Sequence, residues 1–197
     1  PRSTLFPYTT LFRSPEAEHE TALRAEIEER LVGLADSIIA ANPDEAADLI
    51  WRQRASSDKI CTIPPGVDTA LFRPLDREKC RTELGIGKDE HMVLFVGRID
   101  PIKGLDTLLD ATEFLKTAGS PARVHIIGGD FSGDGSPTGS LAELVAHAEN
   151  CGVAGRLVLW GSQPQDRLPV FYSAADVVSV PSRYESFGLV AVEAMAC

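Results

Sequence analysis

From residue 92 onward, short apolar runs alternate with segments of helical periodicity, and this alternation limits the possible folds more than any other feature. The apolar runs are MVLFVG, RVHIIGG, RLVLWG and DVVSVPS. Between them, Leu, Val and Ala recur three or four residues apart, which is typical of helices packed on one side. Strands that are apolar throughout and separated by helices form parallel sheets covered on both faces. The chain is therefore predicted to have an α/β fold.

The helices expected between these runs have recognisable markers. The first passes through Leu105, Leu108, Leu109 and Leu115, and the second through Leu141, Leu144, Val145 and Ala148. A third is opened by Pro169 in its first turn. A final apolar helix ends the chain. Since parallel sheets bind ligands at the carboxyl ends of their strands, functional residues are expected after LFVG, IIGG, LWG and VPS.

The first third of the chain is less regular. Helical spacing from residue 16 to 35 leads into a short strand within ADSIIAAN, and a second helix is expected in PDEAADLIWRQRAS. Pro64, Pro65, Gly66 and Pro74 then surround a short strand as linker residues. A boundary near residue 65 follows, which predicts one domain over residues 15–65 and another over residues 66–197. The opening PRSTLFPYTTLFRS breaks from this pattern. Residues 3–14 resemble a translated sequencing adapter, so 1–14 is expected to be a non-native tail.

Composition excludes several classes of protein. The chain has 197 residues, 44% of them hydrophobic, which is enough for one full domain and part of another. No apolar stretch approaches the length of a membrane span and no secretion signal is visible, so membrane association is not indicated and a cytoplasmic location is expected. The net charge of -10 argues against nucleic acid as a partner. The four cysteines form no C-x-x-C pair, so neither a zinc site nor a disulfide framework is predicted.

Two cations stand on the turn after the first strand of the regular region. In GRIDPIKG, Arg98 and Lys103 follow Gly97 at a strand-to-helix turn. Together with the positive end of the next helix they could bind phosphate oxygens. They could equally be two solvated surface charges, and the residues alone do not decide between these readings. The turn is not G-x-G-x-x-G, so it gives little support to a dinucleotide-binding dehydrogenase.

A glycine-rich stretch, GGDFSGDGSPTGS, follows the second strand. Its acids, Asp130 and Asp134, are too few for a calcium loop, which also needs a terminal Glu. We expect a flexible loop beside the ligand, with Gly128 and Gly129 allowing the ligand close to the backbone.

The last stretch, SRYESFGLVAVEAMAC, places two acids around a helix start. Glu185 precedes a helix expected to begin at residues 186–189, and Glu193 lies inside its apolar sequence. A retaining glycosidase would need its two carboxyls ~5–5.5 Å apart. The helical rise instead separates these two backbones by roughly 8–12 Å, which suits two ends of one extended ligand. Alternatively, Glu193 is a buried acid paired with a basic or backbone group of the protein.

Taken together, these motifs resemble the donor half of a retaining glycosyltransferase of family 4, with the GT-B fold of two Rossmann-like domains. The resemblance rests on IPPGVDTALFRP, LFVGRIDPIKGLDTLL, SAADVVSVPS and ESFGLVAVEAMAC, in that order. It covers the chain from about residue 16 to the end. Its nearest branch includes sucrose-phosphate synthases and the glycosyltransferase of mycothiol synthesis.

The resemblance implies a role for each matched residue. Arg98 and Lys103 would hold the donor diphosphate, Glu185 would contact the transferred sugar, and Glu193 would accept hydrogen bonds from the ribose. Glu193 would then be paired by a nucleotide rather than by the protein. Catalysis would rest on Glu185, Arg98 and Lys103. The remaining expected donor contacts are Gly97, Gly128, Gly129, Ser162, Gln163, Pro164, Ser186, Phe187, Gly188 and Leu189.

The implied reaction moves a sugar from a nucleotide-diphosphate sugar to an unidentified small-molecule or glycan acceptor. No cofactor and no metal are expected. The family continues beyond both ends of this sequence, so the chain is expected to be a fragment that is inactive alone and carries only a remnant of the acceptor domain. The alternatives are a nucleotide-sugar-binding module without transfer activity and a GT-B-like sugar epimerase.

Overall fold

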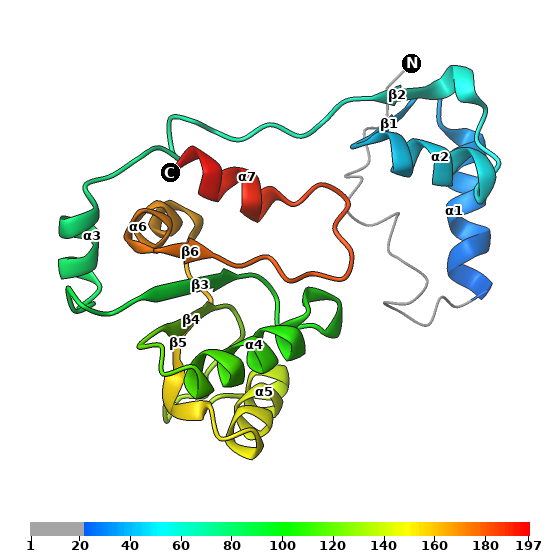
Figure 1. Cartoon of the computed structure of the whole chain (residues 1–197). Helices are drawn as coiled ribbons and strands as arrows, with labels where there is room; N and C mark the ends of the chain where they lie inside the picture. The colour runs from blue at the N-terminus through cyan, green and yellow to red at the C-terminus, as the bar shows by residue number, and fades with distance from the viewer. Residues whose placement is uncertain (1–21) are drawn as a thin grey trace. The chain divides into compact units, whose positions relative to one another are not determined.

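The computed structural model describes residues 22–197, with side chains from residue 26 onward (Figure 1). The proposed non-native tail, residues 1–14, lies outside the described residues. The chain divides into two compact units. The first comprises the described residues up to Gly66 together with Tyr184–Gly188, and the second comprises Val67–Arg183 and Leu189–Cys197. The division between Gly66 and Val67 lies beside the predicted linker, while the assignment of residues 15–65 to an acceptor domain stays a prediction.

The first unit contains two parallel strands and two helices. These are α1 (Ala22–Leu34), β1 (Ile38–Ala40), α2 (Pro43–Trp51) and β2 (Ile60–Thr62), with Ile38 paired to Ile60. The side chain of Asn42 begins α2 by accepting a hydrogen bond from the backbone N–H of Glu45 at 2.8 Å. The predicted order of helix, strand, helix and strand is confirmed.

The second unit is built on a four-stranded parallel sheet. Its strands are β3 (Met92–Val96), β4 (Arg123–Ile127), β5 (Leu157–Gly161) and β6 (Val177–Val178), in the order β5-β4-β3-β6. The chain runs outward from β3 through β4 to β5 and then returns to the other side of β3. This reversal is a topological switch point, where open α/β sheets bind ligands. The predicted parallel α/β fold is confirmed.

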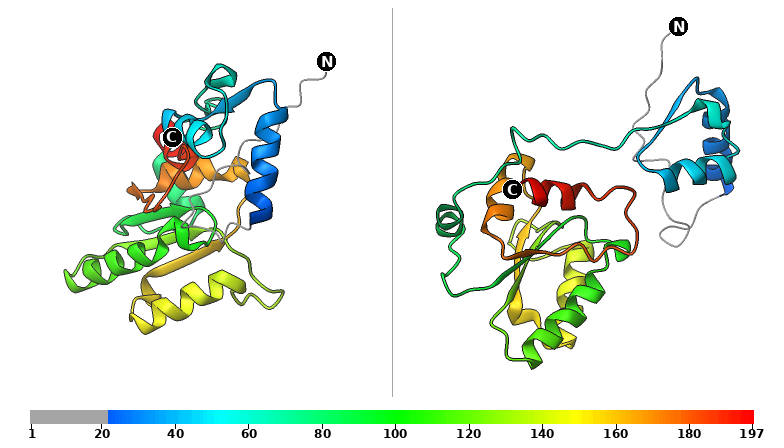
Figure 2. Two further views of the ribbon diagram at one scale, coloured as in Figure 1. Left: turned by 90° about the vertical axis from the view of Figure 1, so that its right-hand side faces the viewer. Right: turned by 45° about the horizontal axis from the view of Figure 1, so that its top comes forward.

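Helices cover both faces of this sheet (Figures 1 and 2). On one face, α4 (Leu105–Thr117) and α5 (Gly139–Asn150) pack against side chains such as Phe95 and Ile126. On the other, α3 (Arg77–Glu83), α6 (Leu168–Ala174) and α7 (Leu189–Ala196) pack against Met92 and Leu94. Successive strand residues point to opposite faces, and both faces are buried, which explains why the strands are apolar throughout. No helix within residues 22–197 is long and apolar enough to cross a membrane.

Two elements differ from the prediction. Helix α3 was not predicted, although Asp76 accepts a hydrogen bond from the backbone N–H of Lys79 at 3.1 Å and so marks its start. Helix α7 begins at Leu189 rather than near residue 186, because Gly188 has a φ of 81°, outside the helical region. Residues 186–188 therefore do not form the first turn of the helix.

Candidate functional site

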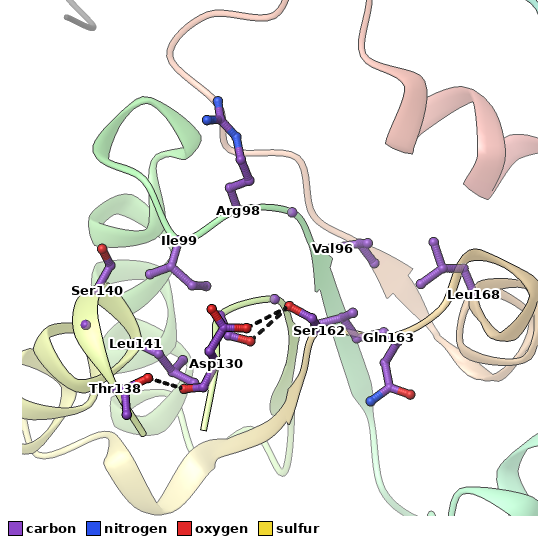
Figure 3. A pocket seen from close by; sticks show the side chains of 15 residues that line it. Val96, Arg98, Ile99, Asp130, Thr138, Ser140, Leu141, Ser162, Gln163 and Leu168 are labelled. Carbon is purple, nitrogen blue, oxygen red and sulfur yellow. Dashed lines mark hydrogen bonds between the residues drawn. The ribbon is translucent and has the colours of Figure 1, made fainter. Parts of the chain in front are cut away.

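A pocket of about 460 Å³ opens at the carboxyl ends of β3, β4 and β5 (Figure 3). Its position agrees with the prediction that functional residues follow the strands. Six of the expected donor contacts line it, namely Gly97, Arg98, Gly128, Gly129, Ser162 and Gln163. The other eight are not among its lining residues; they are Lys103, Pro164, Glu185, Ser186, Phe187, Gly188, Leu189 and Glu193.

Arg98 is the cation of this pocket. Its Nη1 atom lies 3.9 Å from Oδ2 of Asp100, and 58% of its side chain is exposed. In Figure 3 the guanidinium points away from Asp130 and Ser162. An exposed ion pair of this length contributes little, so Asp100 does not prevent Arg98 from binding an anion.

The loop that carries Arg98 and Lys103 is fixed at its far end. Asp100 Oδ1 accepts a hydrogen bond from the backbone N–H of Ile102 at 3.0 Å, which starts a 3₁₀ turn over Pro101–Lys103. Lys103 closes this turn, directly before α4. Both cations thus belong to one short connection at the carboxyl edge of the sheet.

This connection packs directly against the chain leaving β6. The backbone N–H of Arg183 donates to the carbonyl of Ile102 at 2.8 Å, and the Arg183 guanidinium pairs with Asp106 in the first turn of α4. A Cβ atom on Gly104 would lie 2.1 Å from the carbonyl oxygen of Pro181, so only glycine fits there. The two loops that flank the switch point are therefore in contact.

The exit of β4 lies equally close to the exit of β3. A Cβ atom on Gly128 would lie 1.9 Å from the carbonyl oxygen of Gly97. We expected Gly128 to be glycine so that a ligand could approach the backbone. The structure shows a different reason, because the neighbouring protein backbone already occupies that space.

The glycine-rich stretch after β4, which we expected to be a flexible loop, is a hairpin closed by its own hydrogen bonds. Phe131 and Pro137 form an antiparallel bridge, and the backbone N–H of Ser132 donates to the carbonyl of Ser136 at 2.9 Å. The stretch returns through Thr138, whose hydroxyl donates to the carbonyl of Asp130 at 3.1 Å. Its internal hydrogen bonds position the start of α5 at the edge of the pocket.

Polar groups from β5 complete the pocket wall. The Ser162 hydroxyl donates to the carbonyl of Gly129 at 3.0 Å, and Asp130 Oδ1 lies 3.5 Å from the same hydroxyl (Figure 3). Gln163 donates from its amide to the carbonyl of Trp160 at 2.7 Å. The Ser162 bond joins the exits of β4 and β5, while the Gln163 bond lies within the exit of β5. The lining residues of the pocket that were not predicted are Val96, Ile99, Ile127, Asp130, Thr138, Gly139, Ser140, Leu141 and Leu168.

Four of the nine lining residues that were missed, Thr138, Gly139, Ser140 and Leu141, belong to the start of α5. The signal available in the sequence was the glycine-rich stretch running into Leu141, because a strand, a loop and a helix start follow one another there. We identified the stretch as a loop beside the ligand but did not assign the helix start to the site.

Glu193 lies on α7, on the opposite face of the sheet from α5, and is partly buried. Its Oε2 atom accepts a hydrogen bond from the hydroxyl of Tyr172 on α6 at 2.8 Å. Within residues 26–197, no Lys or Arg forms an ion pair with it. The expectation that Glu193 is paired by a nucleotide rather than by the protein is thus wrong in one respect, since the protein supplies a phenol.

Glu185, Ser186, Phe187 and Gly188 belong to the first compact unit, whereas Arg98 and Glu193 belong to the second. In the first unit, Asn42 Nδ2 donates a hydrogen bond to the carbonyl of Ser186. The same side chain caps α2. The segment 184–188 is therefore attached to the start of α2.

In the described part of the chain, no three His, Cys, Asp or Glu side chains gather so that they could hold a metal ion. The expectation that no metal takes part stays a prediction.

Comparison with known proteins gives a family for this arrangement. Residues 76–197 match the sequence profile of the family described as "Glycosyl transferases group 1". The matched range contains the whole sheet of the second unit and the pocket.

Curated relatives share the sequence over most of the chain. A D-inositol 3-phosphate glycosyltransferase of Segniliparus rotundus is 44% identical over 171 residues, which is 86% of this chain and 37% of the relative. That of Mycobacteroides abscessus is 43% identical over 179 residues, 90% of this chain and 39% of the relative. The chain thus spans less than half the length of these relatives.

Solved structures share the fold. Sucrose-phosphate synthase from Thermosynechococcus elongatus superposes with a TM-score of 0.76 at 32% identity, covering 96% of this chain and 45% of that one. HepE of Anabaena, solved with UDP and glucose, gives 0.77 at 25% identity over 93% of this chain and 48% of its own. The predicted GT-B type of α/β fold is confirmed.

Proposed function

Because the chain belongs to the group 1 glycosyl transferases, we propose that the whole protein transfers a sugar from a nucleotide-diphosphate sugar to an acceptor hydroxyl, with retention at the anomeric carbon. The observation that carries the proposal is the pocket at the carboxyl ends of β3, β4 and β5, with Arg98 in its wall. A pocket at this edge of a parallel sheet, beside a switch point, is where such folds take nucleotides. The chain supplies the donor-binding half of the reaction.

The donor is a nucleoside diphosphate sugar, and UDP is its nucleotide. The complex of HepE with UDP and glucose supports this choice, since that protein shares the fold at a TM-score of 0.77. Arg98 and Lys103 bind the diphosphate from the loop after β3, and Glu185 orients the transferred sugar. Residues after β4 and β5, including Gly129 and Ser162, lie beside the nucleoside.

Catalysis depends on stabilising the charge of the departing diphosphate. Two cations on one fixed connection are preorganised for this, because the 3₁₀ turn of Pro101–Lys103 and its contact with the β6 exit leave little to rearrange. The rest of the rate acceleration comes from holding the sugar in position against its acceptor.

The acceptor proposed is D-inositol 3-phosphate, as in the names of the relatives from Segniliparus rotundus and Mycobacteroides abscessus. The acidic chain, with a net charge of -10, would bind such an anion only at a local basic site.

A donor and acceptor screen with the whole protein tests this function. We expect product from a UDP-sugar and D-inositol 3-phosphate, with the anomeric configuration of the donor kept, as read by proton NMR. Donor bound without any transfer to any acceptor would favour a binding module instead. An epimerised sugar formed from donor alone would favour the epimerase.

A further inference from the structure

Helices α6 and α7 lie on the same face of the sheet, and a polar pair joins them. The Tyr172 hydroxyl on α6 donates to Glu193 Oε2 on α7 at 2.8 Å. Tyr172 is only 5% exposed and packs in the core cluster beside Phe72, whose ring centroid lies 6.1 Å away. A tyrosine buried to this degree needs a partner for its hydroxyl, and Glu193 is that partner.

The pair has a fixed direction of hydrogen bonding. Burial raises the pKa of Tyr172 above its ordinary value, and the adjacent Glu193 carboxylate raises it further. The phenol therefore stays protonated at neutral pH and acts as the donor. A carboxylate held by a charge-assisted hydrogen bond keeps a narrower range of rotamers than a free one.

Only one carboxylate oxygen is used in this way. Oε2 receives the Tyr172 hydroxyl, and no other donor to Glu193 is seen among residues 26–197. A carboxylate has about four acceptor positions on its two oxygens. Glu193 therefore keeps acceptor capacity while its orientation is set from the core side.

We propose that Tyr172 is a positioning residue, which orients the Glu193 carboxylate so that it accepts hydrogen bonds from the ribose hydroxyls of the nucleotide donor. The inference rests on the proposed function, in which Glu193 contacts the ribose. It adds a residue that touches no ligand and acts only through Glu193.

Discrimination between ribose and deoxyribose tests this role. Calorimetric titration of the 197-residue chain with UDP, 2′-deoxy-UDP and 3′-deoxy-UDP gives the preference for each hydroxyl. In Tyr172→Phe, which keeps the ring in the core, we expect the preference for UDP to fall by about tenfold, equivalent to about 1.4 kcal/mol. Glu193→Gln should reduce the same preference.

Two further variants separate positioning from stability. Thr112→Val also removes a buried hydroxyl, which donates to the Leu108 carbonyl at 2.6 Å, and it should leave the ribose preference unchanged. Glu193→Asp keeps the charge and the Tyr172 ring but withdraws the carboxylate by one methylene, so its preference should fall like that of Tyr172→Phe. It measures how strongly the preference depends on the position of the carboxylate.

The outcomes separate the proposed role of Tyr172 from the proposed contact between Glu193 and the ribose. If Glu193→Gln loses the preference while Tyr172→Phe keeps it, Tyr172 is not a positioning residue and the proposed function stands. If the unaltered chain does not distinguish UDP from either deoxy form, the ribose contact itself is wrong and the inference falls with it.

Discussion

At the scale of single residues, the best-supported contact of the proposed donor site is Arg98. It lines the pocket, it is exposed, and its ion pair with Asp100 is long. The sequence alone does not decide whether Arg98 and Lys103 bind phosphate or are two solvated surface charges. The structure adds that the connection carrying Arg98 and Lys103 is anchored to the β6 exit through Ile102 and Arg183. The contact of both side chains with phosphate stays a prediction.

Removing either cation should weaken donor binding. We expect Arg98→Ala and Lys103→Ala each to lower UDP affinity by about 1.5–3 kcal/mol, the range for hydrogen bonds to charged groups. Arg167→Ala is the matched control, because Arg167 pairs with Glu83 and does not line the pocket. Isothermal titration measures all three, and unchanged affinity in both Arg98→Ala and Lys103→Ala would exclude the phosphate role.

Gly104 is required by a close approach as well as by its positive φ angle. Gly104→Ala places a Cβ atom 2.1 Å from the Pro181 carbonyl, whereas Gly119→Ala has nothing within 4 Å of its Cβ atom. Both residues have similar positive φ angles, 65° and 74°. Each should lose about 1–3 kcal/mol for backbone strain, and Gly104→Ala should lose more because of the clash. Urea unfolding compares them, and equal losses would show that the β3 and β6 exits separate at low cost.

At the scale of elements, periodicity predicted the strands and helices of the second unit because both faces of the sheet are buried. Met92 and Leu94 face one helix layer and Val93 and Phe95 the other, so the whole run is apolar. Helix α3 was not predicted because its sequence, REKCRTE, is short and mostly polar, so that only the capping residue Asp76 indicates a helix. The hairpin of residues 131–137 was not predicted because serine and aspartate side chains contribute its hydrogen bonds, and these residue types are equally common in loops.

The centre of the sheet contains a titratable group that makes stability depend on pH. His125 in β4 is 2% exposed, accepts a hydrogen bond at Nδ1 from Trp160 at 3.1 Å, and lies 2.8 Å from Glu90 at Nε2. Because the Trp160 indole can only donate, the imidazole is neutral and its proton is on Nε2. Burial lowers the pKa of His125, while the Glu90 carboxylate opposes this.

The sign of the pH effect follows from this pKa. The folded protein binds the His125 proton less readily than the unfolded chain, so His125 contributes full stability above its ordinary pKa of 6.5, and this is lost as pH falls through the lower folded value. We expect the unfolding free energy to decrease from about pH 7.5 to about pH 5.5, by at most ~1.4 kcal/mol per pH unit. His125→Gln should flatten this slope relative to His147→Gln. An equal slope in the two variants would contradict the neutral histidine.

At the scale of the whole molecule, the partition of the site residues could not be predicted. Glu185 and Glu193 are eight residues apart in sequence, yet the first belongs to one compact unit and the second to the other. In the first unit, the Asn42 amide donates to the Ser186 carbonyl, 144 residues away in sequence. Nothing in the local pattern of SRYESFGL indicates a contact so distant along the chain. Motif order and resemblance identified the residues, but only the structure shows which unit holds them.

The length of the chain sets an expectation for activity. Relatives are more than twice as long, and catalysis in this fold needs an acceptor domain to exclude water from the donor. We expect residues 15–197 to bind UDP yet to give no sustained sugar transfer with UDP-sugars and simple acceptors.

The exposed side chains of Met195 on α7 and Val177 on β6 should also make this chain prone to aggregate. Sustained turnover by a soluble monomer would contradict both expectations, because it would show that residues 15–197 contain all the groups that catalysis needs.

The central claim is that the donor nucleotide occupies the pocket at the carboxyl edge of the sheet. Amide-resolved NMR during titration with UDP tests it most directly, because β3 and β4 each have a reporter at both ends. We predict shifts for Gly97, Gly128 and Ser162, with little change at His91 and Ala122, which flank the opposite edge. Shifts confined to His91, Ala122 and their neighbours, with Gly97, Gly128 and Ser162 unmoved, would contradict the account.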